Sequence, residues 1–181
     1  MYSVDFETHA IVSGSATPPK PVGCAIRKPD GSAKYWAFGH PTNNNCTEEE
    51  FRAELLSIWG EEFVGHNIMG FDEQVAYHHL NMPARSPFQT HDTLFQAYLI
   101  DPHTKSLRLK DLAAEWLGMP PDDQQELYDW IMANVPECRT RKQCGAFICR
   151  APGDLVGRYA VSDVNMAQAL HDYCWPKLDQ M

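Results

Sequence analysis

The sequence predicts an α/β fold in which a mixed β-sheet is covered by helices. Two observations support this class. Before Thr47, apolar segments rich in β-formers are joined by a tight-turn sequence, which is typical of an antiparallel hairpin. After Thr47, short apolar segments alternate with segments whose apolar residues recur at helical spacing, which is typical of strand–helix units. A hairpin followed by such units gives a sheet with both antiparallel and parallel strands.

Three strands are expected before Thr47: Tyr2 to Glu7, Val22 to Arg27, and Ala33 to Phe38. The last two are joined by KPDG, whose Pro and Asp-Gly favour a tight turn, so they should form the hairpin. GSATPPKP, which precedes them, has the composition of a loop.

The first predicted helix lies in NCTEEEFRAELLSIW. Thr47 occupies the N-cap position and Glu50 follows three residues later, which is the pattern of a capping box. Next, EEFVGHNI predicts a buried strand with a polar end, and GFDEQVAYHHL predicts the helix after it. QTHDTLFQAYLI repeats the pattern as a short strand that runs into a helix.

Three further helices are expected in the last part of the chain. SLRLKDLAAEWLG places its apolar residues on one helical face, and Gly118 with the following MPP ends that helix. The next helix should cover Asp123 to Ala133, and the last should cover Leu155 to Tyr173. Between them, NVPECRTRKQCGAFICRAPGD is expected to be a long irregular connection.

Composition limits the kind of protein. The 181 residues are 44% hydrophobic and 22% charged, which suits a single globular domain spanning 1–181. No window has the apolar run of a membrane span, and Asp5 falls where a signal peptide would be basic or apolar. Six cysteines are too few for a secreted disulfide scaffold, so we expect reduced thiols in a cytoplasm, of a bacterial or bacteriophage-infected cell. Zinc binding by Cys138, Cys144 and Cys149 is not favoured, because their spacing lacks CxxC.

The net charge of −9 argues against a passive nucleic-acid binder, which should carry a basic face. It leaves open an enzyme that acts on nucleic acid through metal ions, because divalent cations supply positive charge locally.

Two carboxylates stand at the start of the chain, in SVDFETH. On a strand, residues i and i+2 share a face, so Asp5 and Glu7 project together while Val4 and Phe6 pack on the other side. Like charges that close repel unless a proton or a cation compensates them. A solvated strand end is the alternative for this motif taken alone.

Two later segments carry further candidates. In VGHNIMGFD, Asn67 follows a strand and Asp72 falls in the first turns of the next helix, where function gathers in open α/β sheets. In GRYAVSD, Tyr159 and Asp163 are i and i+4 on a helix and share a face. Taken alone, the first segment is explained equally well by a helix-capping Asp beside a turn Asn. The second, taken alone, is better explained by a half-buried Tyr and a surface Asp.

Together, DFET, HNIMGFD and YAVSD resemble the three motifs of the DEDD superfamily of 3′–5′ exonucleases, in the branch with Tyr in the third motif. The resemblance covers nearly the whole chain. It implies a ribonuclease H-like fold with a five-stranded mixed sheet whose second strand is antiparallel to its neighbours. It also implies release of nucleoside 5′-monophosphates from a 3′ end, with two Mg²⁺ or Mn²⁺ ions as cofactors.

The resemblance further implies roles for the site residues. Asp5 would bridge both metal ions, and Glu7 and Asp163 would complete the site that activates water. Asp72 would bind the second metal, directly or through water. Tyr159 would orient the attacking water, because a phenol whose ordinary pKa is near 10 is a poor base at neutral pH.

Five residues are candidate substrate contacts. Asn67 and the backbone near Thr8 would approach the terminal nucleotide, and His66 lies close enough to contact it. Ile11 falls where the family often places an apolar wedge between the last two bases. Phe147 would stack on a base, although a packing role under a loop is equally compatible.

Three functions are compatible with the motifs. The first is a proofreading exonuclease domain of DNA replication, similar to those of family A DNA polymerases of bacteriophages. In that case DNA is the substrate and a polymerase domain is the partner, in cis or in trans. The second is a stand-alone RNase D-like enzyme acting on RNA. The third, an inactive binding module, is disfavoured because all four carboxylates and the Tyr are present.

Overall fold

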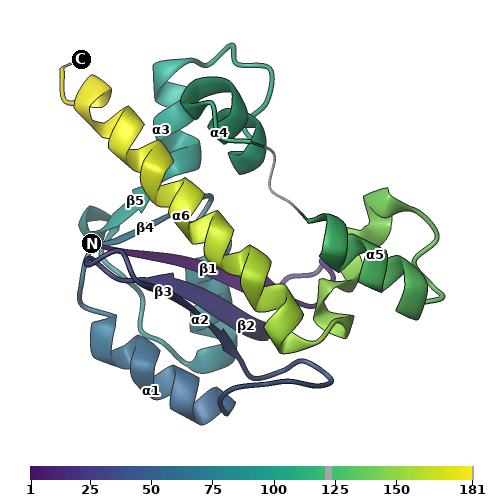
Figure 1. The fold of residues 1–181 in the computed structure, drawn as a ribbon. Coiled ribbons are helices and arrows are strands. Elements are labelled where there is room, and N and C mark those ends of the chain that lie inside the picture. The colour runs from purple at the N-terminus through teal and green to yellow at the C-terminus, as the bar shows by residue number, and fades with distance from the viewer. Residues whose placement is uncertain (121–123, 181) are drawn as a thin grey trace.

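A computed structural model describes residues 1–120 and 124–180 (Figure 1). The strands are β1 (Tyr2–Thr8), β2 (Pro21–Arg27), β3 (Ala33–Ala37), β4 (Phe63–Gly65) and β5 (Thr90–Asp92). The α-helices are α1 (Glu48–Ile58), α2 (Asp72–Leu80), α3 (Thr93–Ile100), α4 (Leu109–Leu117), α5 (Gln125–Asn134) and α6 (Gly153–Leu178). Two 3-10 helices are η1 (Pro87–Gln89) and η2 (Arg141–Arg150).

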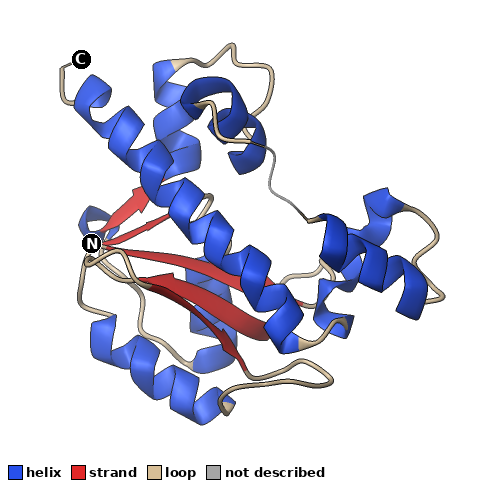
Figure 2. Cartoon of the chain, viewed as in Figure 1, coloured by secondary structure: helices blue, strands red, loops and turns tan. Residues whose placement is uncertain are grey.

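The five strands form one mixed sheet in the order β3-β2-β1-β4-β5. Strand β2 is antiparallel to both β1 and β3, whereas β1, β4 and β5 run parallel (Figure 2). The predicted α/β class and the antiparallel second strand are therefore confirmed. β1 occupies the centre of the sheet, and its segment with Asp5 and Glu7 pairs with β2.

Helices cover both faces of the sheet. Helices α1 and α2 lie on one side, and the long α6 crosses the other (Figure 1). The core under α1 and α2 includes Val4 and Phe6, the β1 side chains that alternate with the two carboxylates. The core under α6 includes Tyr35 of β3 and Tyr159 of α6. Both faces are therefore buried, as the class requires.

The capping box at the start of α1 is formed as predicted. Glu50 N donates to Thr47 Oγ1 at 3.1 Å, and Thr47 N donates to Glu50 Oε2 at 2.8 Å. The predicted end of α4 is also present, because Gly118 takes a left-handed conformation with φ of 62°.

Three elements differ from expectation. The strand expected in EEFVGHNI is only Phe63–Gly65, because Asn67 with φ of 59° turns the chain away from the sheet. The connection expected to be irregular contains η2, which buries Cys144 and Cys149. Helix α6 is longer than expected and runs from Gly153 to Leu178, because its buried face continues through Leu170 and Cys174. The expected helix start at Asp123 lies outside the described residues.

Candidate active site

Three carboxylates converge on the α6 side of the sheet. Asp5 and Glu7 alternate with buried side chains along β1, so both project toward α6, which contributes Asp163. One carboxylate oxygen from each of the three lies within 4.8 Å of the others, and all three residues are half-buried. Among the described residues, these three are the potential metal ligands that lie close enough together to hold one ion.

Asp72 lies next to this group but is bonded differently. β4 pairs with β1 only at Tyr2 and Ser3, so β1 continues beyond its neighbour on that side. The Phe6 N–H, which has no strand partner there, donates to Asp72 Oδ1 at 2.7 Å. Asp72 is 3% exposed, at the first residue of α2. The structure thus brings Asp72 to β1 but outside the three-carboxylate group.

The electrostatics of the site favour binding of a cation. Burial, and after it the charge of Asp163, raise the pKa of Glu7 to about 8. Burial also raises the pKa of Asp72 to about 8, although its hydrogen bond from Phe6 opposes this. Burial and the charges of Asp72, Glu7 and Asp163 raise the pKa of Asp5 well above its ordinary value. Without a cation, this site retains protons near neutral pH.

Sequence reasoning did not single out Lys110, which lies against the carboxylates. Its Nζ is 3.5 Å from Asp163 Oδ1, and its charge lowers the pKa of Asp5 and of Glu7, opposing the effect of burial. Lys110 comes from α4, and no local pattern links that helix to β1 or α6. A cation therefore already occupies the edge of the site.

Tyr159 lies one turn before Asp163 on α6, as its spacing predicts, and it is buried. Its hydroxyl oxygen accepts a hydrogen bond from Leu127 N at 3.1 Å, near the start of α5. A phenol that accepts this bond keeps its O–H as a donor. The role in orienting water stays a prediction.

The loop of the second motif is ordered by Asp92, which is another residue that sequence reasoning missed. Asp92 is buried at the end of β5 and accepts hydrogen bonds from the backbone N–H of Asn67 at 2.9 Å and of Met69 at 3.2 Å. It also caps α3 by accepting from Leu94 N. An Asp between a strand and a helix is the usual signal of an N-cap, and this signal was available in the sequence. The Asn67 side chain is exposed and accessible to a substrate.

His66 has protein partners on both ring nitrogens. Nδ1 lies 2.9 Å from Thr93 Oγ1, and Nε2 lies 2.7 Å from the Leu107 carbonyl oxygen. Burial lowers its pKa. A polar contact with substrate would require one of these bonds to open, so the geometry gives His66 a structural role that the sequence did not suggest.

The other candidate substrate contacts differ in position and exposure. Thr8 lies at the end of β1, where the pairing with β2 shifts register after Glu7. Ile11 is 74% exposed in the following loop, as a wedge between bases would require. Phe147 packs partly against the core under α6. Its expected stacking on a base is not tested by this geometry.

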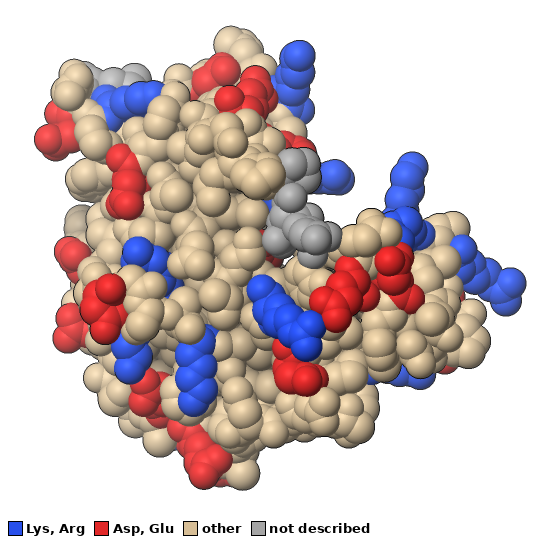
Figure 3. Space-filling view, in the orientation of Figure 1, with Lys and Arg blue, Asp and Glu red and all other residues tan. Residues whose placement is uncertain are grey.

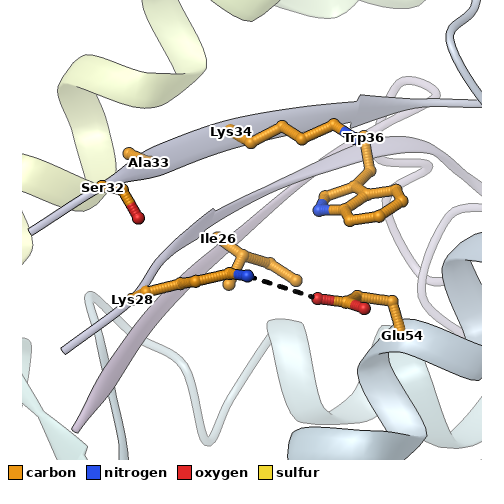
Figure 4. A pocket seen from close by; sticks show the side chains of 7 residues that line it. All are labelled: Ile26, Lys28, Ser32, Ala33, Lys34, Trp36 and Glu54. Carbon is orange, nitrogen blue, oxygen red and sulfur yellow. Dashed lines mark ion pairs between the residues drawn. The ribbon is translucent and has the colours of Figure 1, made fainter. Parts of the chain in front are cut away.

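A hollow lies near the turn of the β2–β3 hairpin and does not include the carboxylates. It is formed between β2, β3 and α1, where Lys28 Nζ is 4.0 Å from Glu54 Oε1 (Figure 4). On the face shown in Figure 3, basic and acidic side chains are interspersed rather than gathered into a basic surface. Positive charge for an anionic substrate must therefore come from elsewhere on this molecule or from bound cations.

The cysteines form no disulfide among the described residues. Cys138 and Cys144 lie close together, with 3.5 Å between their sulfur atoms. No helix in residues 1–120 or 124–180 combines the length and apolar character needed to cross a bilayer.

The residues present fit divalent metal ions. The group offers only oxygen ligands, which Mg²⁺ and Mn²⁺ prefer, and Lys110 shows that a cation is accommodated beside it. A mixed sheet of this order with a carboxylate group on its central strand is the arrangement expected from the resemblance to 3′–5′ exonucleases.

The comparisons agree with this class. The sequence profile of a family described as 3′–5′ exonuclease matches residues 3–179, so the chain belongs to that family. The fold is similar to the solved structure of Brucella melitensis NrnC, with a TM-score of 0.62 and 19% sequence identity, over 99% of this chain and 73% of that one. No curated protein matches the sequence significantly.

Proposed function

We propose that this exonuclease acts with two divalent cations on a single-stranded or frayed 3′ end and releases nucleoside 5′-monophosphates. The observation that carries the proposal is the three-carboxylate group, in which oxygens from β1 and α6 lie within 4.8 Å of one another. The raised pKa values of Asp5 and Glu7 mean that these two carboxylates retain protons near neutral pH when no cation is bound. Such a site is suited to release these protons and to bind Mg²⁺ or Mn²⁺ in their place.

Each residue has a part in this proposal. Asp5, Glu7 and Asp163 would hold the cations, and Asp72 would support them from beside β1, directly or through water. Bound divalent cations lower the pKa of the attacking water and offset charge on the phosphoryl oxygens. Tyr159 would donate its O–H to that water and orient it.

Substrate positioning would fall to side chains around the group. The exposed Asn67 and the backbone at Thr8 would contact the terminal nucleotide, and Ile11 would separate the last two bases. Phe147 would stack on a base, with a contribution of about 1–3 kcal/mol that does not depend on sequence. In this arrangement His66 supports the site from behind through Leu107.

Two substrates are candidates, and we propose RNA before DNA. The fold resembles that of NrnC. An identity of 19% carries the fold rather than the substrate, so proofreading of DNA beside a polymerase remains the second candidate. The distinction depends on contacts to the 2′-OH.

The test is digestion of three 5′-labelled substrates: single-stranded RNA, single-stranded DNA, and duplex DNA with a mismatched 3′ end. We expect stepwise shortening with Mg²⁺ or Mn²⁺, none with excess chelator, and recovery when metal is restored. RNA should be degraded at least as fast as DNA. Full activity in excess chelator would exclude the two-metal mechanism.

Substrates with blocked ends and circular substrates provide the controls. A 3′-phosphorylated end should resist digestion, whereas a blocked 5′ end should have no effect. Efficient cleavage of circular single strands would identify an endonuclease and overturn the proposed direction of attack.

A further inference from the structure

Lys110 lies at the edge of the carboxylate group. Its side chain is 31% exposed, and its Nζ is 3.5 Å from Asp163 Oδ1. It is therefore placed at the solvent side of the carboxylate group rather than inside the core. Tyr128 of α5 lies within range of its charge. Burial raises the pKa of the Tyr128 hydroxyl, and the charge of Lys110 lowers it.

The position of Lys110 is fixed by the fold. Leu107, just before α4, accepts the hydrogen bond from His66, which itself follows β4. Ser106 Oγ donates to Asp111 Oδ2 at 2.5 Å and closes the first turn of α4 around Lys110. This anchoring keeps the ammonium group near Asp163 without burying it, and leaves its flexible four-carbon stem to change direction.

Charge determines which partner Lys110 prefers. In the absence of metal ions, Lys110 is paired with Asp163, and its charge compensates part of the repulsion among the carboxylates. Bound divalent cations would neutralise those carboxylates, and the attraction of Lys110 to Asp163 would then be lost. A phosphate of the nucleic acid would be the anion left for Lys110 to contact.

We propose that Lys110 is a substrate-contacting residue that exchanges Asp163 for a phosphate oxygen of the 3′-terminal nucleotides when metal ions and substrate are bound. The inference rests on the proposed function. It also explains how a chain with a net charge of −9 gains a fixed positive charge at its active site.

The experiment measures binding rather than turnover. A fluorescent single-stranded oligonucleotide with phosphorothioate linkages at its 3′ end is titrated with protein in Ca²⁺, and anisotropy is followed over a range of salt concentrations. Lys110→Gln should weaken binding about tenfold, because a charge-assisted hydrogen bond is lost. The slope of log affinity against log salt should fall by about 0.7, the value for one single-strand phosphate contact.

Lys28→Gln is the matched control. It removes the same charge at the hollow between β2 and α1, at the opposite end of β2 from Gly23, which pairs with Glu7. Its affinity and salt slope should equal those of the unaltered protein. Lys110→Arg should keep most of the slope, and Lys110→Met, which retains the aliphatic stem, replaces the Gln variant if that one does not fold.

A second measurement needs no nucleic acid. Mn²⁺ binding by calorimetry should be at least as tight in Lys110→Gln as in the unaltered protein, because a competing cation has been removed from Asp163. Weaker Mn²⁺ binding, or an oligonucleotide affinity and salt slope equal to those of the unaltered protein, would overturn the role of Lys110 and leave the nuclease proposal standing. Failure of the unaltered protein to bind the oligonucleotide would instead contradict the proposed function.

Discussion

At the scale of single residues, Asp5 and Tyr159 have separable tasks. Asp5 belongs to the carboxylate group, whereas the Tyr159 hydroxyl accepts a hydrogen bond from Leu127 N. In the proposed function, Asp5 would hold metal and Tyr159 would orient the attacking water. Substitutions at these two positions should therefore fail in different ways.

Asp5→Ala should abolish both Mn²⁺ binding and turnover. Tyr159→Phe should leave Mn²⁺ binding unchanged and lower the rate by about 10²–10⁴-fold, because one positioned donor is lost in the transition state. Calorimetry and single-turnover digestion measure the two effects. A Tyr159→Phe enzyme that works at the unaltered rate would make Tyr159 a packing residue that only caps α5.

At the scale of elements, α4 is connected to the sheet through His66. This residue bonds Thr93 at the start of α3 and the Leu107 carbonyl before α4. One imidazole thus connects β4 with two helices, and one of these helices carries Lys110. The same residue was expected from the sequence to contact substrate, so a stability measurement can separate the two roles.

His66→Ala should lower the free energy of unfolding by about 1–3 kcal/mol, because partly buried partners lose their hydrogen bonds. Amide hydrogen exchange should accelerate in α4 more than in α1. His78→Ala, at an exposed position on α2, is the control and should change neither. Unchanged stability and exchange together with weakened oligonucleotide binding would favour the substrate contact.

At the scale of the whole molecule, stability should depend on pH through two sets of groups with opposite effects. Burial lowers the pKa of His171 to about 4, and it also lowers that of His66 and His91. Because the folded protein disfavours the charged form of these imidazoles, its free energy of unfolding rises with pH up to about 6.5, the ordinary pKa of histidine. Above that value the carboxylates dominate, because Glu7 and Asp72 titrate at about 8 in the folded protein.

The metal-free protein should therefore lose stability as pH rises from about 6.5 to 8. In that range the folded state keeps protons that the unfolded state has released. The free energy of unfolding therefore falls by about 1 kcal/mol per pH unit for each such proton. Thermal unfolding in chelator measures the decline. Mg²⁺ should reduce it, and so should Glu7→Gln, which is neutral at every pH. Higher stability at pH 8 than at pH 6.5 in chelator would contradict the assignment of these shifts.

The sequence alone determined the features that depend on the short repeat of a strand or a helix. Strand alternation placed Asp5 and Glu7 on one face, helical spacing placed Tyr159 one turn from Asp163, and the capping box marked the start of α1. Each of these involves residues a few positions apart, whose relative direction is set by backbone geometry. The fold class followed from the same periods.

Only the tertiary structure decided which distant groups meet. The pairing of Lys110 with Asp163, the bonds of His66 to Leu107, and the bond from Leu127 N to the Tyr159 hydroxyl each join separate elements. The early end of β4 likewise left the Phe6 N–H for Asp72. Such contacts depend on how helices pack on the sheet, and no periodicity within one segment encodes the distance to another.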